Sequence, residues 1–109
     1  MSYYESTFIV DSQLPDEVIR QKVGHFQEVV SSNGGEILHL EQWGNRRLAY
    51  EIRKRSQGYY VFMQISASPQ GVRELERALR LDESVLRFLT IVVEEKAVKR
   101  DSTEQAEEE

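Results

Sequence analysis

Residues 59 to 65 read Tyr-Tyr-Val-Phe-Met-Gln-Ile, a segment in which aromatic and β-branched side chains predominate. That composition over so short a length predicts a strand. The polar residues 53 to 58 precede it and end in a glycine, so they are predicted to form a hairpin connection. Before them, residues 36 to 52 predict a long extended segment in which Gly44-Asn45 marks a bulge or bend. The two strands should pair antiparallel.

A helix is predicted on each side of this hairpin in the sequence. Pro15 presets a helical φ at an opening position, and apolar residues then recur at spacings of three and four to about Ser32. The tripeptide Asn33-Gly34-Gly35 ends this helix, because these residues tolerate the left-handed conformation of a helix C-terminus. After the hairpin, Ser68-Pro69 supplies a cap and a first-turn proline, and helical spacing continues to about Leu81.

One further strand is predicted at each end of the domain. Residues 3 to 11 are short, apolar and followed by a turn signal, and residues 85 to 93 are apolar on both parities. The order is therefore β-α-β-β-α-β, an α+β ferredoxin-like split βαβ sandwich whose four-stranded antiparallel sheet carries two helices on one face. The other face is left bare, and the apolar last strand leads to the hypothesis that a partner covers part of it.

Length and charge divide the chain into a domain and a tail. At 109 residues one domain is expected, and we place it at residues 1 to 94, followed by a disordered acidic tail at residues 95 to 109. The net charge is −5, but residues 94 to 109 contain seven acids and three bases and so contribute −4 of it. Residues 1 to 93 hold twelve acids and eleven bases, which leaves −1. The acidic total therefore does not exclude a nucleic-acid partner for the domain.

Composition argues against several classes of protein. The chain has no cysteine, which excludes disulfides and thiolate metal sites and favours the cytoplasm. No apolar run is long enough for a membrane span, and no signal peptide opens the chain. No catalytic or nucleotide-binding motif is present, so neither an enzyme nor a cofactor is expected. His25 and His39 lack ligands at metal spacing, which favours exposed or hydrogen-bonded histidines over a metal site.

The most informative segment for function is basic. Five of the eleven bases of residues 1 to 93 lie between Arg46 and Arg55, where Glu51 is the only acid. On an extended chain these charges reach both faces of an edge hairpin. They can keep an exposed edge from aggregating, and they can bind phosphates beside aromatic residues such as Trp43 and Tyr50. The two roles can coexist, and the density of charge favours binding.

The second helix carries three more arginines on one stripe, Arg73, Arg77 and Arg80. Here the favoured interpretation is structural. Glu74 with Arg77 and Glu76 with Arg80 have the spacing of ordinary ion pairs on a helix surface.

Several short motifs are spread over residues 3 to 93. They are Tyr4-Glu5, Asn33-Gly34-Gly35, Trp43-Gly44-x-Arg46-Arg47-Leu48-Ala49-Tyr50-x-Ile52, Gly58-Tyr59-Tyr60 and Glu76-Arg77-x-Leu79-Arg80-Leu81-Asp82-Glu83-x-Val85-x-Arg87. Together they resemble the ribosomal protein S6 family of the bacterial small subunit, and Arg-Arg-Leu-Ala-Tyr is the most specific part.

The resemblance implies a structural constituent of the small ribosomal subunit. It implies that the chain binds the central domain of 16S ribosomal RNA during platform assembly, with ribosomal protein S18 as its heterodimer partner. By the same analogy, the RNA-binding and partner-binding residues are Arg46, Arg47, Leu48, Tyr50, Arg53, Lys54, Arg55 and Arg87. Some relatives begin with basic residues that contact RNA, whereas Ser2-Tyr3 are neutral here. The acidic end is similar to that of members whose terminal glutamates are enzymatically extended.

Two other domains share this order of strands and helices. An RNA-recognition motif would stack bases on the central strands, but Gln57-Gly58-Tyr59-Tyr60-Val61-Phe62 lacks the opening base and the small residue of its signature. An acylphosphatase-like or small-molecule-binding domain would need a glycine-rich phosphate loop after the first strand, and none is present there.

Overall fold

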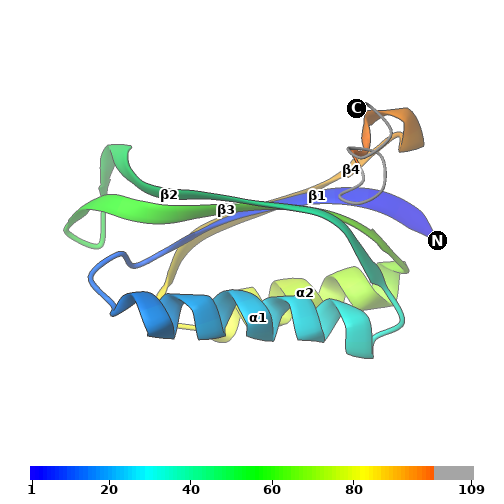
Figure 1. Ribbon diagram of the computed structural model, residues 1–109, viewed down its shortest axis with the longest axis horizontal. Coiled ribbons are helices and arrows are strands. Elements are labelled where there is room, and N and C mark those ends of the chain that lie inside the picture. Colours follow the sequence, from blue (N-terminus) through cyan, green and yellow to red (C-terminus); the bar gives the residue numbers. More distant parts are fainter. Residues whose placement is uncertain (100–109) are drawn as a thin grey trace, which may run out of the picture.

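The computed structural model describes residues 1 to 99, and they form one sheet layered on two helices (Figure 1). The elements follow the predicted order, with the predicted hairpin at β2 and β3. Their bounds are β1 Ser2–Val10, α1 Asp16–Ser32, β2 Glu36–Ile52, β3 Arg55–Ala67, α2 Pro69–Leu81, β4 Val85–Val93 and a 3-10 helix, η1, at Glu95–Ala97. Both helices lie on the same side of the sheet (Figure 1). The ferredoxin-like prediction is confirmed.

The four strands are antiparallel neighbours in the order β2-β3-β1-β4. β1 is central, and its Phe8 lies opposite Val61 of β3 and Phe88 of β4. Period-two alternation then sends every second side chain toward the helices. A single core results between sheet and helices, and its largest fully buried side chains include Phe8, Phe26, Met63, Ile65, Leu75 and Leu79.

The hairpin connection is shorter than the sequence predicts. β2 ends at Ile52 and β3 begins at Arg55, so only Arg53 and Lys54 form the turn, both with positive φ (53° and 66°). The prediction of a connection over residues 53 to 58 is therefore wrong. A two-residue turn with two positive φ values matches the twist of the flanking strands, which offsets the strain of non-glycine residues there.

β2 is irregular at two places against β3. The register shifts between Gln42 and Gly44, and Gly44 has a φ of 85°. The predicted bulge is therefore present, but it lies at Trp43-Gly44, one residue before the predicted Gly44-Asn45. A larger shift lies between Arg47 and Ile52. A shift of this kind interrupts the regular alternation of side chains along a strand.

Two general findings concern the described chain. Within residues 1 to 99, no helix is both long and apolar enough to cross a membrane. Over the same residues, no three His, Asp or Glu side chains gather in a way that could hold a metal ion.

Candidate functional site

The face of the sheet away from the helices carries an exposed aromatic and aliphatic patch. The ring of Trp43 on β2 stacks on Tyr60 and Phe62 of β3, with centroids 6.2 Å and 5.8 Å apart. On the β4 side, Leu89 is 64% exposed and Ile91 46% exposed, and the register places them on the same face. We call these five residues the open-face patch. Apolar surface of this kind on a small domain marks an interaction site.

The tip of the β2–β3 hairpin rises on this same side of the sheet (Figure 1). A second, small apolar cluster supports it, in which Leu48 packs with Ile9 and Leu86. Gly58 allows the close approach, because a Cβ there would lie 2.3 Å from Cγ2 of Ile9. Leu48 is buried and supports the tip by packing on β1 and β4, and its contact with a partner stays a prediction.

Arg46 and Arg47 lie between the open-face patch and the hairpin tip. The Arg46 guanidinium lies 5.9 Å from the centre of the Trp43 ring, and its Nε donates to the Trp43 carbonyl at 3.4 Å. Arg47 is opposite Gln57 and exposed. Neither arginine pairs with a carboxylate anywhere in the described part of the chain. Both guanidiniums therefore remain available to an anionic partner.

Lys54 in the turn and Arg55 at the start of β3 differ in their surroundings. Arg55 donates through Nε to Asp11, at 3.2 Å from both carboxylate oxygens. This ion pair ties the start of β3 to the end of β1, so the charge of Arg55 is already neutralised. Lys54 is exposed at the turn itself.

Across the tip, Tyr50, Arg53 and Arg87 come together from β2, the turn and β4. Arg87 donates to the hydroxyl of Tyr50 and lies 5.8 Å from the centre of its ring. Arg53 Nη1 donates to the Glu83 carbonyl at 2.7 Å. Tyr50 itself is 60% exposed. The structure thus brings these three predicted residues together on one side of the hairpin.

The opposite end of the open face is crossed by the chain that follows β4 (Figure 1). Gln64 of β3, only 3% exposed, donates through Nε2 to Ala97 O at 3.1 Å and to Glu5 Oε2 at 2.9 Å. Its Oε1 accepts from Lys99 N at 2.7 Å. Part of the predicted tail, residues 95 to 99, therefore contacts the sheet, and the rest of that tail, residues 100 to 109, lies outside the described residues.

A polar network joins this crossing segment to the open-face patch. Glu41 accepts hydrogen bonds from Trp43 Nε1 at 2.7 Å and His39 Nε2 at 2.6 Å, and Lys99 Nζ lies 3.7 Å away. The Trp43 hydrogen bond, then that of His39, holds the pKa of Glu41 below its ordinary value. The sequence pointed to none of Glu41, Gln64 and Lys99. The partners of Gln64 and Lys99 are distant in sequence, whereas Glu41 is bonded by two residues of its own strand, Trp43 and His39.

The helix arginines do not form the ion pairs that the sequence favours. Within residues 1 to 99, no ion pair joins Glu74 to Arg77 or Glu76 to Arg80. The guanidinium of Arg80 instead lies 5.9 Å from the centre of the Phe88 ring on β4. Packing against a neighbouring strand therefore replaces the helix-surface contact.

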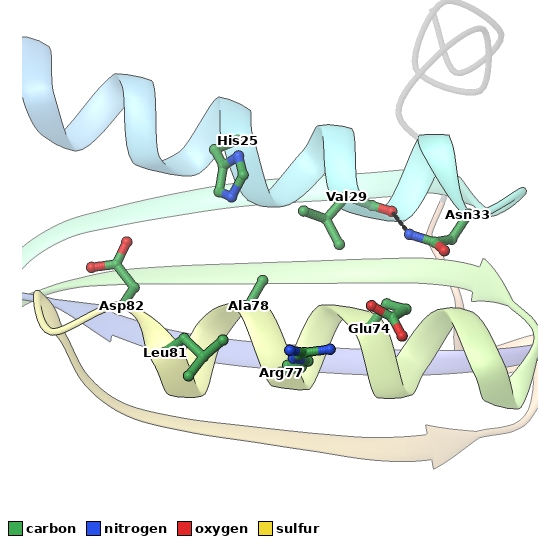
Figure 2. Close-up of a pocket in the computed structure, with 8 residues that line it drawn as sticks. All are labelled: His25, Val29, Asn33, Glu74, Arg77, Ala78, Leu81 and Asp82. Carbon is green, nitrogen blue, oxygen red and sulfur yellow. Dashed lines mark hydrogen bonds between the residues drawn. The ribbon is translucent and has the colours of Figure 1, made fainter.

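The groove between the two helices has a different character (Figure 2). It has a volume of about 510 Å³, and Figure 2 shows His25 and Val29 of α1 facing Glu74 and Ala78 of α2. Lys22 and Asp82 form an ion pair at 3.0 Å near one end. Both signs of charge line this groove, so it lacks the one-sided charge of the hairpin.

Comparison with known proteins gives a consistent result. The model of the family described as ribosomal protein S6 matches residues 3–92. A small ribosomal subunit protein bS6 from Syntrophobacter fumaroxidans is 43% identical over 88% of this chain, which spans 65% of that relative's length. One from Caldanaerobacter subterraneus is 41% identical, over 84% of this chain and 96% of the relative. The crystal structure of 30S ribosomal protein S6 from Thermotoga maritima has a TM-score of 0.80 at 28% identity, covering 98% of this chain and 94% of that one.

Proposed function

The chain belongs to the ribosomal protein S6 family, and on that premise we propose that it binds the central domain of 16S ribosomal RNA together with ribosomal protein S18 during platform assembly. It is a structural constituent of the small ribosomal subunit and works in the cytoplasm, on the ribosome. We propose no reaction for it.

The observation that carries the proposal is the position of free guanidiniums beside an exposed apolar patch. Arg46 and Arg47 have no carboxylate partner within residues 1 to 99, and the open-face patch begins at Trp43, against which Arg46 packs. Phosphates are bound by such guanidiniums, whereas exposed aliphatic residues such as Leu89 are buried by protein partners. The arginines therefore belong to the RNA side, and the patch belongs to the side of the protein partner.

The remaining predicted residues contribute in different ways. Tyr50, Arg53, Lys54 and Arg87 are exposed and extend the RNA-facing surface around the tip. Leu48 and Arg55 support that surface from behind, since one is buried and the other is paired with Asp11.

Base stacking on the sheet, as in an RNA-recognition motif, is the alternative that the geometry disfavours. That mode needs free aromatic faces on the central strands. Here the Trp43 ring already stacks on Tyr60 and Phe62. A base could use them only after Trp43 moved away.

The test is a double substitution, Arg46→Ala with Arg47→Ala, assayed by gel shift with 16S central-domain RNA and the partner protein at fixed salt. We expect affinity to fall about tenfold or more and the slope of log affinity against log salt to decrease by about two, because two phosphate contacts are lost. The matched control is Arg73→Ala with Arg77→Ala, which removes the same charge from the helix surface. Equal binding by the double variant and the wild type would reject this assignment.

A further inference from the structure

At the β4 side of the hairpin, Arg80 of α2 lies in the same cavity as Arg53 and Arg87. A cavity of about 240 Å³ lies at this edge of the sheet, and three guanidiniums line it: Arg53 from the turn, Arg80 from α2 and Arg87 from β4. Its apolar wall includes Leu86 and Phe88. Three elements that are distant in sequence thus bring like charges to one place.

No acidic side chain lines this cavity, and within the described residues none of the three arginines pairs with a carboxylate. Elsewhere the half-buried Arg55 pairs with Asp11 and the half-buried Lys22 pairs with Asp82, whereas Arg53, Arg80 and Arg87 are exposed. Gathering three like charges without a counter-charge is unfavourable, and an anion in their midst relieves the repulsion.

Neutral partners fix the directions of the three guanidiniums. The Glu83 carbonyl accepts from Arg53, the Phe88 ring lies beneath Arg80, and Tyr50 accepts from Arg87. Each contact restrains its side chain while leaving most of the five N–H donors of the guanidinium unused. Each arginine thus has one contact that restrains it and further donors that can meet an anion, which reduces the side-chain entropy lost on binding.

We propose that Arg53, Arg80 and Arg87 form a phosphate-binding site for the RNA backbone, separate from the contact made by Arg46 and Arg47. The inference rests on the proposed function and adds to it a residue, Arg80, that the sequence assigned to a helix ion pair. RNA is favoured over an acidic protein because the 60% exposed ring of Tyr50 stands beside the arginines. Exposed aromatic rings next to guanidiniums suit nucleotides, which present a phosphate and a stacking base together.

The site also connects to the first contact. Tyr50 and Arg87 line a smaller hollow together with Tyr60, the residue on which Trp43 stacks, and Arg46 lies over Trp43. Basic and aromatic side chains therefore follow one another from the β2 edge to the β4 edge. A single RNA strand can contact both ends of this band.

The experiment compares Arg80→Gln with Arg77→Gln, which removes one charge from the same helix outside the cavity. Binding to 16S central-domain RNA is measured over a range of salt concentrations with the partner protein present. We expect Arg80→Gln to weaken binding about tenfold and to lower the salt slope by about one, and Arg77→Gln to behave as wild type. Thermal melting of each variant checks folding, and Arg80→Lys, which keeps the charge, should retain part of the affinity.

The outcomes separate this site from the proposed function. If Arg80→Gln and Arg80→Lys both bind like wild type while the Arg46 and Arg47 double variant is weakened, the phosphate site is rejected and the function stands. If the double variant is also unaffected, the proposed function fails. If Arg80→Gln weakens association with the partner protein but leaves the RNA salt slope unchanged, the cavity receives a protein carboxylate and the proposal is wrong.

Discussion

The two faces of the sheet are built from alternate residues of the same strands, yet they differ in almost every physical property. On the helix face, Phe8, Met63 and Ile65 are completely buried. On the open face, one strand position away, Trp43, Leu89 and Ile91 remain exposed, and Arg46 beside Trp43 has no carboxylate partner within residues 1 to 99. The described chain covers the open face only at its ends, with the hairpin tip at one and residues 95 to 99 at the other.

This difference separates stability from binding. The helix face removes its apolar side chains from water within one molecule, so its contribution to folding does not depend on a partner. The open-face patch keeps apolar area in water, and that area can contribute only when another surface covers it. A substitution on the open face should therefore leave stability unchanged, and one in the core of the helix face should reduce it.

The largest effect is expected from the centre of the helix face. Phe8→Ala removes a fully buried ring that contacts Phe26 edge-on at 5.2 Å, and it should lower the free energy of unfolding by about 3 to 5 kcal/mol. Leu89→Ala on the open face is the control and should cost less than about 0.5 kcal/mol. Urea unfolding followed by circular dichroism measures both. Similar losses of unfolding free energy for the two variants would show that both faces contribute to stability.

A smaller effect is expected beneath the hairpin tip, where the open face has its own small core. Gly58→Ala would place a Cβ 2.3 Å from Cγ2 of Ile9, and the resulting overpacking should cost about 1 to 3 kcal/mol. Gly24→Ala is the matched control, since no atom lies within 4 Å of a Cβ there, and in a helix interior it should stabilise by about 0.5 to 1 kcal/mol. Thermal melting distinguishes the two signs, and a stabilising Gly58→Ala would contradict the packing described for the tip.

The smallest effect concerns the helix layer and depends on pH. Burial raises the pKa of Asp82, but hydrogen bonds from Ser84 and the ammonium of Lys22 outweigh it and hold the pKa below its ordinary 3.8. The carboxylate therefore contributes stability above the unfolded pKa, and this contribution disappears as pH falls through the folded pKa. Asp82→Asn should cost about 1 kcal/mol at pH 7. Urea unfolding at several pH values should show that the difference in free energy of unfolding between wild type and variant disappears below pH 3.8. A difference that does not change with pH would show that the ionised carboxylate of Asp82 is not its source.

Much of the fold was predictable because its signals are local. The strand composition of residues 59 to 65, the cap at Ser68-Pro69 and the stop at Asn33-Gly34-Gly35 all correspond to observed elements, and the Ser68 side chain accepts from Gly71 N at 3.1 Å. The shape of the hairpin tip was not predictable. Leu48 is buried, Tyr50 is 60% exposed, and the register of β2 against β3 shifts between Arg47 and Ile52, which no local signal in the sequence indicates.

Local signals in the chain specify the order of elements, the apolar stripes of the helices and the concentration of bases around the hairpin, because periodicity and capping act over a few residues. Which arginines are neutralised depends instead on contacts between elements that are distant in sequence. Arg55 meets Asp11 from forty-four positions away, whereas Arg80 meets an aromatic ring instead of its helix neighbour Glu76. Whether an arginine is neutralised depends on whether the fold brings a distant carboxylate within a few ångströms of it. Coulomb attraction is strong only at that distance, and the packing of the sheet sets the distance.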